Sequence, residues 1–219
     1  MQLSRDGAQH LPAALTPEEL NRLEQALPDL PDGPGLRLAG VPTLAELLQA
    51  HGPVGRVAAD HLGPAARPVR ALLFNKTPER NWALGWHQDR TIPVRKRIET
   101  PGFAHWTIKS GIQHVEPPFA LLERMLTLRV HLDPVGPANA PLLVAAGSQR
   151  LGKIPEQDIT PIVQRLGTHA CLAERGDIWL YVTTILHASE AAEEPKSRRV
   201  LQVDYSADTL PPPLEWLGV

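Results

Sequence analysis

The sequence has little cysteine, few aromatic residues and no long apolar run. Cys171 is the only cysteine among the 219 residues, which excludes an intramolecular disulfide. No uncharged apolar stretch reaches the roughly 20 residues that a membrane-spanning helix needs. The first residues, MQLSRD, lack the apolar core of a signal peptide. We therefore expect a cytoplasmic protein without a membrane partner.

Neither sign of charge dominates the chain. The formal net charge is -2, from 22 basic and 24 acidic residues, and the two signs are interspersed. Such a chain lacks the electrostatic attraction that draws proteins to nucleic acid or to anionic lipid. We expect a small-molecule partner, and the sequence leaves the oligomeric state open.

The length predicts a single domain over residues 1–219, with a helical N-terminal part over 1–66. The 23 prolines are scattered, which is typical of loops and edge strands rather than of disorder. Thr16-Pro17-Glu18-Glu19 has the pattern of an N-cap, a first-turn proline and a capping box. Further helices are predicted from Thr43 to Ala50 and from about Val54 to Leu62.

From Val69 onward the chain consists of short apolar runs separated by turn residues. We predict strands over Val69–Phe74, Met125–Leu132, Leu142–Ala146, Asp177–Val182 and Arg199–Tyr205. Helices followed by many short strands indicate an α+β, mainly β chain, in which helices buttress one face of an antiparallel double sheet.

Residues 95–118 show little regular pattern, and long ordered loops in compact domains often serve as lids. The positive charges of this segment suit an acidic or carboxylate-bearing substrate. A solvated loop without a role is an equal alternative.

His87 and Asp89 form the most informative pattern. Residues two apart on a strand point to one face, so this imidazole and carboxylate can share a ligand. Trp82 and Trp86 frame the pair in a chain poor in aromatics. With His187 about a hundred residues later, the chain offers two imidazoles and one carboxylate, a set that suits non-heme Fe(II). An isolated His-x-Asp is weak evidence, and His131-Leu132-Asp133 is a rival triplet without the tryptophan frame.

Two adjacent arginines follow His187. A guanidinium binds a carboxylate through two parallel hydrogen bonds, so either could anchor a dicarboxylate co-substrate. Strand alternation lets only one of Arg198 and Arg199 face a pocket, and the residues alone leave that choice open.

Residues 69–207 resemble the phytanoyl-CoA dioxygenase family of Fe(II)- and 2-oxoglutarate-dependent oxygenases. The matching segments are Phe74-Asn75-Lys76-Thr77-Pro78-Glu79, His87-Gln88-Asp89, Leu128-Arg129-Val130-His131-Leu132-Asp133, Gly147-Ser148, Gly176-Asp177 and His187-Ala188-Ser189 with Arg198. The resemblance implies a double-stranded β-helix (jelly-roll, cupin-like) core over 67–209. It also implies Fe(II) held by His87, Asp89 and His187. Arg198, eleven residues after His187, is then the partner of the far carboxylate of 2-oxoglutarate.

The resemblance implies the chemistry as well. Such enzymes use O2 and 2-oxoglutarate, release succinate and CO2, and hydroxylate an unactivated C–H bond. Asp89 argues against halogenation, because halogenating relatives carry a small residue at that position. The chain departs from the family between 139 and 149, where Ala140 replaces a common glycine and Ala145-Ala146-Gly147-Ser148-Gln149 replaces Pro-Gly-Ser-His. The metal ligands lie outside this segment, so the departure concerns the turn and the substrate pocket.

Three more residues are candidates for co-substrate binding. Arg129 alternates with Thr127 and His131 on a predicted core strand, and Asn75 and Lys76 lie about a dozen positions before His87. Solvated surface side chains are the alternative for all three. We therefore predict an Fe(II)/2-oxoglutarate dioxygenase that hydroxylates a small organic substrate. A non-catalytic metal-binding jelly roll and a metal-dependent hydrolase or isomerase on the same scaffold are the alternatives.

Overall fold

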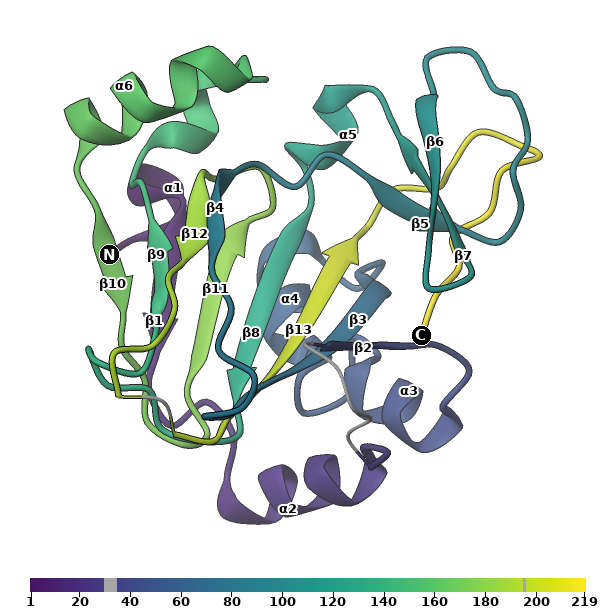
Figure 1. The fold of residues 1–219 in the computed structure, drawn as a ribbon. Coiled ribbons are helices and arrows are strands. Elements are labelled where there is room, and N and C mark those ends of the chain that lie inside the picture. Colours follow the sequence, from purple (N-terminus) through teal and green to yellow (C-terminus); the bar gives the residue numbers. More distant parts are fainter. Residues whose placement is uncertain (30–34, 195) are drawn as a thin grey trace.

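The computed structural model describes residues 1–29, 35–194 and 196–219, and it consists mainly of antiparallel sheets (Figure 1). The larger sheet has six strands in the order β1 (Ala8–Leu11), β11 (Ile178–Val182), β8 (Leu126–His131), β13 (Arg198–Ser206), β3 (Arg67–Lys76) and β2 (Gly35–Leu38). The smaller sheet has the order β10 (His169–Cys171), β9 (Leu142–Val144), β12 (His187–Ser189) and β4 (Leu84–His87). The two sheets face each other as a jelly roll, as predicted.

Helices cover the outer face of the six-stranded sheet. They are α2 (Pro17–Ala26), α3 (Pro42–Leu48) and α4 (Gly55–Leu62). The remaining helical elements are α1 (Leu3–Asp6), α5 (Phe119–Leu122), η1 (Ser148–Leu151) and α6 (Glu156–Leu166). Within the described parts of the chain, no helix has the length and apolar character that crossing a bilayer requires.

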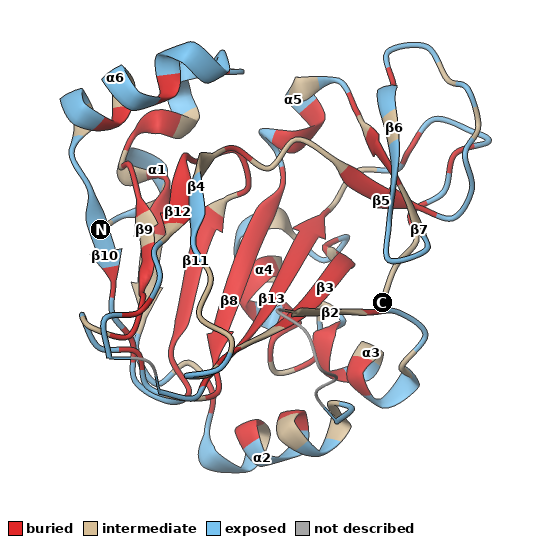
Figure 2. Cartoon of the chain, viewed as in Figure 1, coloured by how far each residue is buried: buried red, intermediate tan, exposed pale blue. Residues whose placement is uncertain are grey.

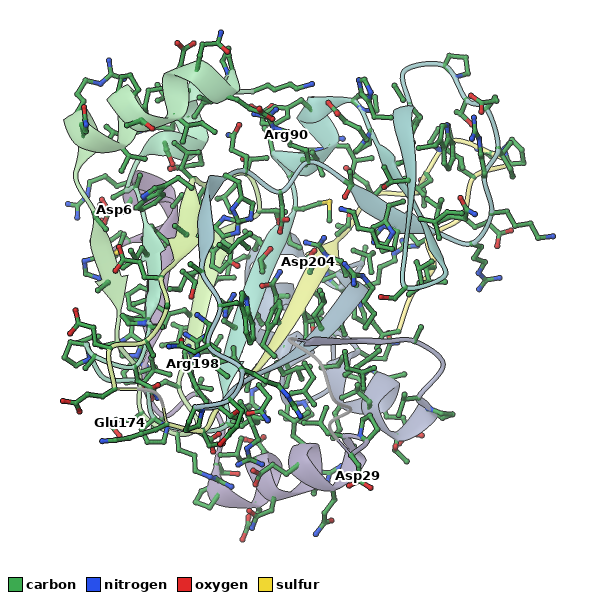
Figure 3. The ribbon with its side chains drawn as sticks, in the orientation of Figure 1. Asp6, Asp29, Arg90, Glu174, Arg198 and Asp204 are labelled. Atoms are coloured by element: carbon green, nitrogen blue, oxygen red, sulfur yellow. The ribbon has the colours of Figure 1, made fainter. Side chains whose placement is uncertain are left out.

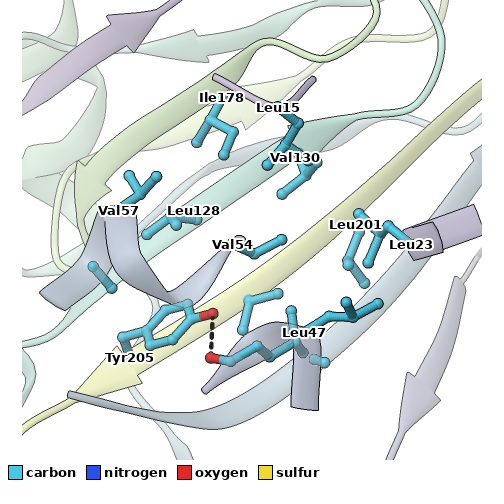
Figure 4. Packing of buried hydrophobic residues seen from close by; sticks show 14 of the residues in the cluster. Leu15, Leu23, Leu47, Val54, Val57, Leu128, Val130, Ile178, Leu201 and Tyr205 are labelled. Atoms are coloured by element: carbon cyan, nitrogen blue, oxygen red, sulfur yellow. Dashed lines mark hydrogen bonds between the residues drawn. The ribbon is translucent and has the colours of Figure 1, made fainter. Parts of the chain in front are cut away.

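Strand alternation creates the main core between these helices and the sheet. Leu128, Val130 and Leu201 point outward from β8 and β13 and pack with residues of α2, α3 and α4 (Figure 4). Tyr205 adds a polar tie, because its hydroxyl donates to the Leu48 carbonyl at 3.0 Å. The same alternation sends every second residue of these strands into the space between the two sheets.

The helix predictions are confirmed with small shifts in their bounds. Thr16 and Glu19 form the predicted capping box at the start of α2. The next two helices begin at Pro42 and Gly55. The N-terminal part is less purely helical than predicted, because it also supplies β1 and β2, the two edge strands of the larger sheet. The five predicted strands are all present.

The prediction that 95–118 lacks regular structure is wrong. This segment contains β6 (Ala104–Lys109) and β7 (Ile112–Glu116), which form a three-stranded sheet with β5 (Ile92–Val94). The small sheet has its own apolar cluster, in which Val94 and Val115 pack with Trp216, near the end of the chain. A lid function for this hairpin stays a prediction.

Candidate metal centre

Three side chains that can bind a metal meet where β4 and β12 run side by side. His87 ends β4 and pairs across the sheet with His187, the first residue of β12. Their ring centroids are 4.3 Å apart. Asp89 lies just beyond the end of β4, whereas the sequence predicted it on the same strand as His87. One ligand atom from each of the three lies within 4.8 Å of the others. The predicted trio therefore converges on a space that one ion can bridge.

Both imidazoles are oriented by their own backbone. Nδ1 of His87 lies 2.7 Å from the Gly85 carbonyl oxygen, and Nδ1 of His187 lies 3.0 Å from that of Ile185. A carbonyl only accepts hydrogen bonds, so each Nδ1 carries the proton and each Nε2 lone pair is free for a metal. Burial, followed by the neighbouring His87, lowers the pKa of His187 to about 4. The ring is therefore neutral at pH 7, as metal binding requires.

Arg70 holds the carboxylate of the trio. From β3 it donates through Nη2 to Oδ2 of Asp89 at 2.7 Å and through Nε to Asp204 on β13. Burial alone would raise the pKa of Asp89, but Arg70 and the two imidazoles hold it below its ordinary range. Asp89 is therefore ionised. Since Arg70 occupies Oδ2, Oδ1 remains as the second acceptor oxygen of Asp89.

Gln88, between the two ligands, fixes the backbone that carries them. Its side chain is buried and forms three hydrogen bonds to backbone groups. Nε2 donates to the carbonyls of Gly152 at 3.0 Å and Thr184 at 2.8 Å, and Oε1 accepts from Ile154 N–H at 2.9 Å. This anchor fixes the backbone between the two ligands, although Asp89 lies beyond the end of β4.

Three buried cations lie on the inner face of the larger sheet. Lys76, Arg129 and Arg198 are 1%, 6% and 2% exposed, respectively. Nζ of Lys76 donates to Ser189 Oγ at 3.1 Å and to the Glu190 carbonyl at 2.6 Å. Arg129 donates to Gln202 Oε1 at 3.0 Å, and Arg198 donates to the Ala140 carbonyl. None of the three forms an ion pair with a described residue. Figure 3 marks Arg198 and Asp204 toward opposite ends of β13.

The three cations destabilise one another in this buried position. Burial, followed by Arg198 and Arg129, lowers the pKa of Lys76 to about 8. Burial and then Arg129 lower the pKa of Arg198 to about 9. Buried charge is costly unless an opposite charge compensates it. A surplus of buried positive charge therefore fits a bound anion.

Several buried polar atoms in the same region have no partner. They are Nε of Arg129, Nε of Arg198, both ring nitrogens of His131 and the hydroxyl of Tyr181. Buried polar groups are normally hydrogen-bonded, so a cluster of unpaired ones indicates a ligand site. The Tyr181 ring lies 5.7 Å from that of His187, which places this cluster beside the trio. Sequence reasoning missed Tyr181 and treated His131 only as a rival ligand.

Strand alternation separates the remaining candidates. Asn75 neighbours Lys76 on β3, and its outward-pointing neighbours Ala71 and Leu73 pack under the helices. The register thus places Asn75 on the opposite face from Lys76. The rival triplet does not assemble, because Asp133 pairs with Arg199 at 2.7 Å while the ring nitrogens of His131 have no partner.

Ala140 explains how the departure from the family pattern is accommodated. Its φ of 49° lies in the left-handed region, which favours the glycine common in relatives. The strained turn aims the Ala140 carbonyl at Arg198. The departure therefore bears on the orientation of Arg198 and leaves the three candidate metal ligands in place.

A cavity of about 370 Å³ lies beside α6, and His87 is the one member of the trio among its lining residues. Its lining residues are Trp86, His87, Gln88, Arg90, Glu156, Ile159 and Thr160. Asp89 and His187 do not line this cavity, so it touches the trio at one residue.

The phytanoyl-CoA dioxygenase sequence family matches residues 3–200. The chain belongs to this family. Membership makes it an Fe(II)- and 2-oxoglutarate-dependent oxygenase, and the convergent His-Asp-His trio is consistent with that assignment. No curated protein matches the sequence.

Solved structures confirm the fold of this phytanoyl-CoA dioxygenase family member. EctD from S. alaskensis, with 2-oxoglutarate and 5-hydroxyectoine, is 20% identical with a TM-score of 0.70, covering 99% of this chain and 77% of EctD. AviO1 from Streptomyces viridochromogenes Tue57 is 18% identical with a TM-score of 0.62, and the match covers 96% of this chain and 94% of AviO1. The epimerase SnoN from nogalamycin biosynthesis is 17% identical with a TM-score of 0.65, and the match covers 93% of this chain and 77% of SnoN.

Proposed function

We propose that this protein hydroxylates a small organic substrate, with His87, Asp89 and His187 as the iron ligands. The observation that carries the proposal is the position of the trio beside a buried surplus of positive charge. Two imidazoles and one carboxylate suit iron and leave coordination positions open. The adjoining cations suit a dicarboxylate. A metal-binding trio alone or a cationic pocket alone would suit many proteins, but together they match an enzyme that needs both iron and 2-oxoglutarate.

The donor set fits both groups. The two Nε2 atoms and Oδ1 of Asp89 would hold Fe(II), and Arg198 would bind the far carboxylate of 2-oxoglutarate. Unpaired Nε atoms on Arg198 and Arg129 are the donors that an incoming carboxylate requires. Iron with 2-oxoglutarate and O2 supplies the oxidising power for C–H hydroxylation.

The protein's own residues prepare this site. Gln88 and Arg70 fix the ligand orientation before any metal binds. Lys76 and Arg129 add positive charge on the co-substrate side. Burial raises the pKa of the Tyr181 phenol, so its hydroxyl remains protonated and can donate to a bound carboxylate.

A binding experiment tests the metal and co-substrate roles separately. Mn(II) binding, followed by electron paramagnetic resonance, should weaken at least about 100-fold in His187→Ala, since an essential ligand is lost. The exposed His61 provides the matched control, His61→Ala, which should bind Mn(II) normally. Arg198→Met should bind Mn(II) but lose 2-oxoglutarate affinity, whereas Arg22→Met, a change at an exposed arginine, should lose neither.

Turnover distinguishes the alternatives. With Fe(II), ascorbate and a substrate panel, the proposed enzyme forms succinate from 2-oxoglutarate. A hydrolase or isomerase would act with Zn(II) in the absence of 2-oxoglutarate, and Arg198→Met would leave it active. A binding protein would take up metal and 2-oxoglutarate without forming succinate under any condition. Either of the last two results would overturn the proposal.

A further inference from the structure

A second group of cationic and polar side chains lies near Arg70, at the β2 edge of the larger sheet. Arg37 comes from β2, Lys109 from the end of β6 and His114 from β7. Nη1 of Arg37 lies 3.4 Å from Ser110 Oγ, which ties the β6–β7 hairpin to the edge of the larger sheet. Nζ of Lys109 lies 3.2 Å from Oγ1 of Thr91, two residues beyond Asp89. The group therefore borders the metal centre.

The strand registers direct these side chains to one region. Arg37 pairs with Leu72, so it shares the inner face of the sheet with Arg70. On the hairpin, Lys109 pairs with Ile112 and Thr107 with His114, which places Lys109 and His114 on the same face. Three separate strands thus direct donors and an acceptor toward the side of Asp89 that Arg70 contacts.

The group contains unpaired atoms and uncompensated charge. Nε of Arg37 and Nε2 of His114 are buried without partners, and the His114 side chain is 0% exposed. Nδ1 of His114 donates to the Ile112 carbonyl at 3.0 Å, so Nε2 is an acceptor. Arg37 and Lys109 form no ion pair with a described residue. Asp89 and Asp204, the two acids that contact Arg70, are both engaged by it.

The electrostatic environment agrees with this geometry. Burial, followed by Arg70, lowers the pKa of Arg37 and of Lys109. Burial lowers the pKa of His114 to about 4, and Lys109, Arg70 and Arg37 contribute in the same direction. His114 is therefore neutral at pH 7. Arg37 is half-buried and Lys109 is exposed, so the region offers two partly solvated cations without acidic partners and one free acceptor.

We propose that Arg37 and Lys109 bind the carboxylate of the substrate, and that His114 Nε2 accepts a hydrogen bond from a hydroxyl or amino group on the same molecule. The substrate class is a small hydroxy or amino acid. This inference rests on the proposed function, because it places the substrate beside the iron position. The dicarboxylate co-substrate is bound separately by Lys76, Arg129 and Arg198.

Matched probe pairs test the inference. The protein with Mn(II) and 2-oxoglutarate is mixed with mandelate or mandelamide, and with proline or prolinamide, and Mn(II)-induced broadening of the probe protons is measured. Each acid should bind more tightly than its amide. Arg37→Gln and Lys109→Met should each weaken acid binding about tenfold, because a charge-assisted hydrogen bond is lost. The exposed Lys96, on the same segment, provides the control Lys96→Met, which should bind the acids normally.

The outcomes separate this inference from the function on which it rests. Equal broadening by acids and amides, or a preference for acids that survives both substitutions, would overturn the substrate assignment while Mn(II) and 2-oxoglutarate still bind. Failure of the wild-type chain to bind Mn(II) and 2-oxoglutarate would overturn the proposed function and this inference with it. His114→Gln should weaken the binding of mandelate but not of cyclohexanecarboxylate, which lacks a donor.

Discussion

The two faces of the six-stranded sheet are equally buried but chemically opposite. Figure 2 colours its central strands, β11, β8 and β13, almost entirely as buried. On the outer face, Leu128 and Val130 pack against helices. On the inner face of the same strand, Thr127, Arg129 and His131 carry hydrogen-bonding or charged groups. Burial therefore does not distinguish the two faces, whereas the chemistry of the buried groups does.

The contrast indicates where the fold is stabilised and where it is kept ready for a ligand. Each apolar side chain on the outer face stabilises the fold by about 1.5–3 kcal/mol on burial. The inner face holds charges whose desolvation is only partly compensated. Two carboxylates, Asp89 and Asp204, share the single positive charge of Arg70, whereas the co-substrate cations have no acidic partner among the described residues. The outer face should thus control stability and the inner face binding.

The largest expected effect comes from the ion pair between Arg70 and Asp204 on the inner face. Arg70→Leu leaves Asp204 buried without its cation, and we expect the free energy of unfolding to fall by about 3–5 kcal/mol. Urea unfolding of the metal-free chain measures this loss. The double variant Arg70→Leu/Asp204→Leu removes the buried Arg70–Asp204 pair but leaves Asp89 without Arg70, so it should recover part of the stability. A double variant no more stable than the single one would show that the ion pair is not the cause.

A similar loss of stability without loss of binding is expected on the outer face. Leu201→Ala removes a fully buried side chain from the cluster beneath the helices and should cost about 2–5 kcal/mol. Its side chain points away from the metal centre, so affinity for Mn(II) and 2-oxoglutarate should stay at the wild-type value. Calorimetric titration of the folded variant checks this, and a large drop in affinity would break the proposed division between the faces.

The sequence predicted the outer face better than the inner one. Short apolar runs bounded by turn residues identified the core strands. The alternation of Arg129 with Thr127 and His131 also suggested that Arg129 faces inward. The short edge strand β1 was missed, since Ala8 and its neighbours become a strand only through pairing with β11, far along the chain.

The candidate metal ligands could be predicted because two of them are neighbours in sequence and the third follows a family pattern. The choice of Arg198 over Arg199 came from that family spacing, and the structure shows the alternation behind it. Arg198 is buried inward, while Arg199 pairs with Asp133 outside. Arg70 and Asp204 were missed, because their contact joins residues 134 positions apart. Polar residues alternating with apolar ones on a core strand were the only available indication.

A gain in stability is expected from the unbalanced inner cations. Arg129→Met removes a buried charge that has no acidic partner, so the metal-free chain should become more stable by about 1 kcal/mol. The measurement is urea unfolding in a buffer without carboxylates or phosphate. The same variant should bind 2-oxoglutarate more weakly. A less stable variant with unchanged 2-oxoglutarate affinity would contradict the assignment of Arg129 to a binding site.

A pH dependence is expected at Lys76. The pKa of Lys76 is lowered to about 8 in the folded chain from an ordinary value of 10.5, mainly by burial. The cost of the buried ammonium group is fully present below pH 8 and is relieved as pH rises from 8 to 10.5, because the unfolded chain then holds more protons than the folded one. Metal-free wild type should therefore gain stability relative to Lys76→Met over this window, whereas Lys96→Met should track wild type. A difference in the free energy of unfolding between wild type and Lys76→Met that is independent of pH would show that Lys76 is not a destabilised cation. The contrast between the two faces would then rest on Arg129 and Arg198 alone.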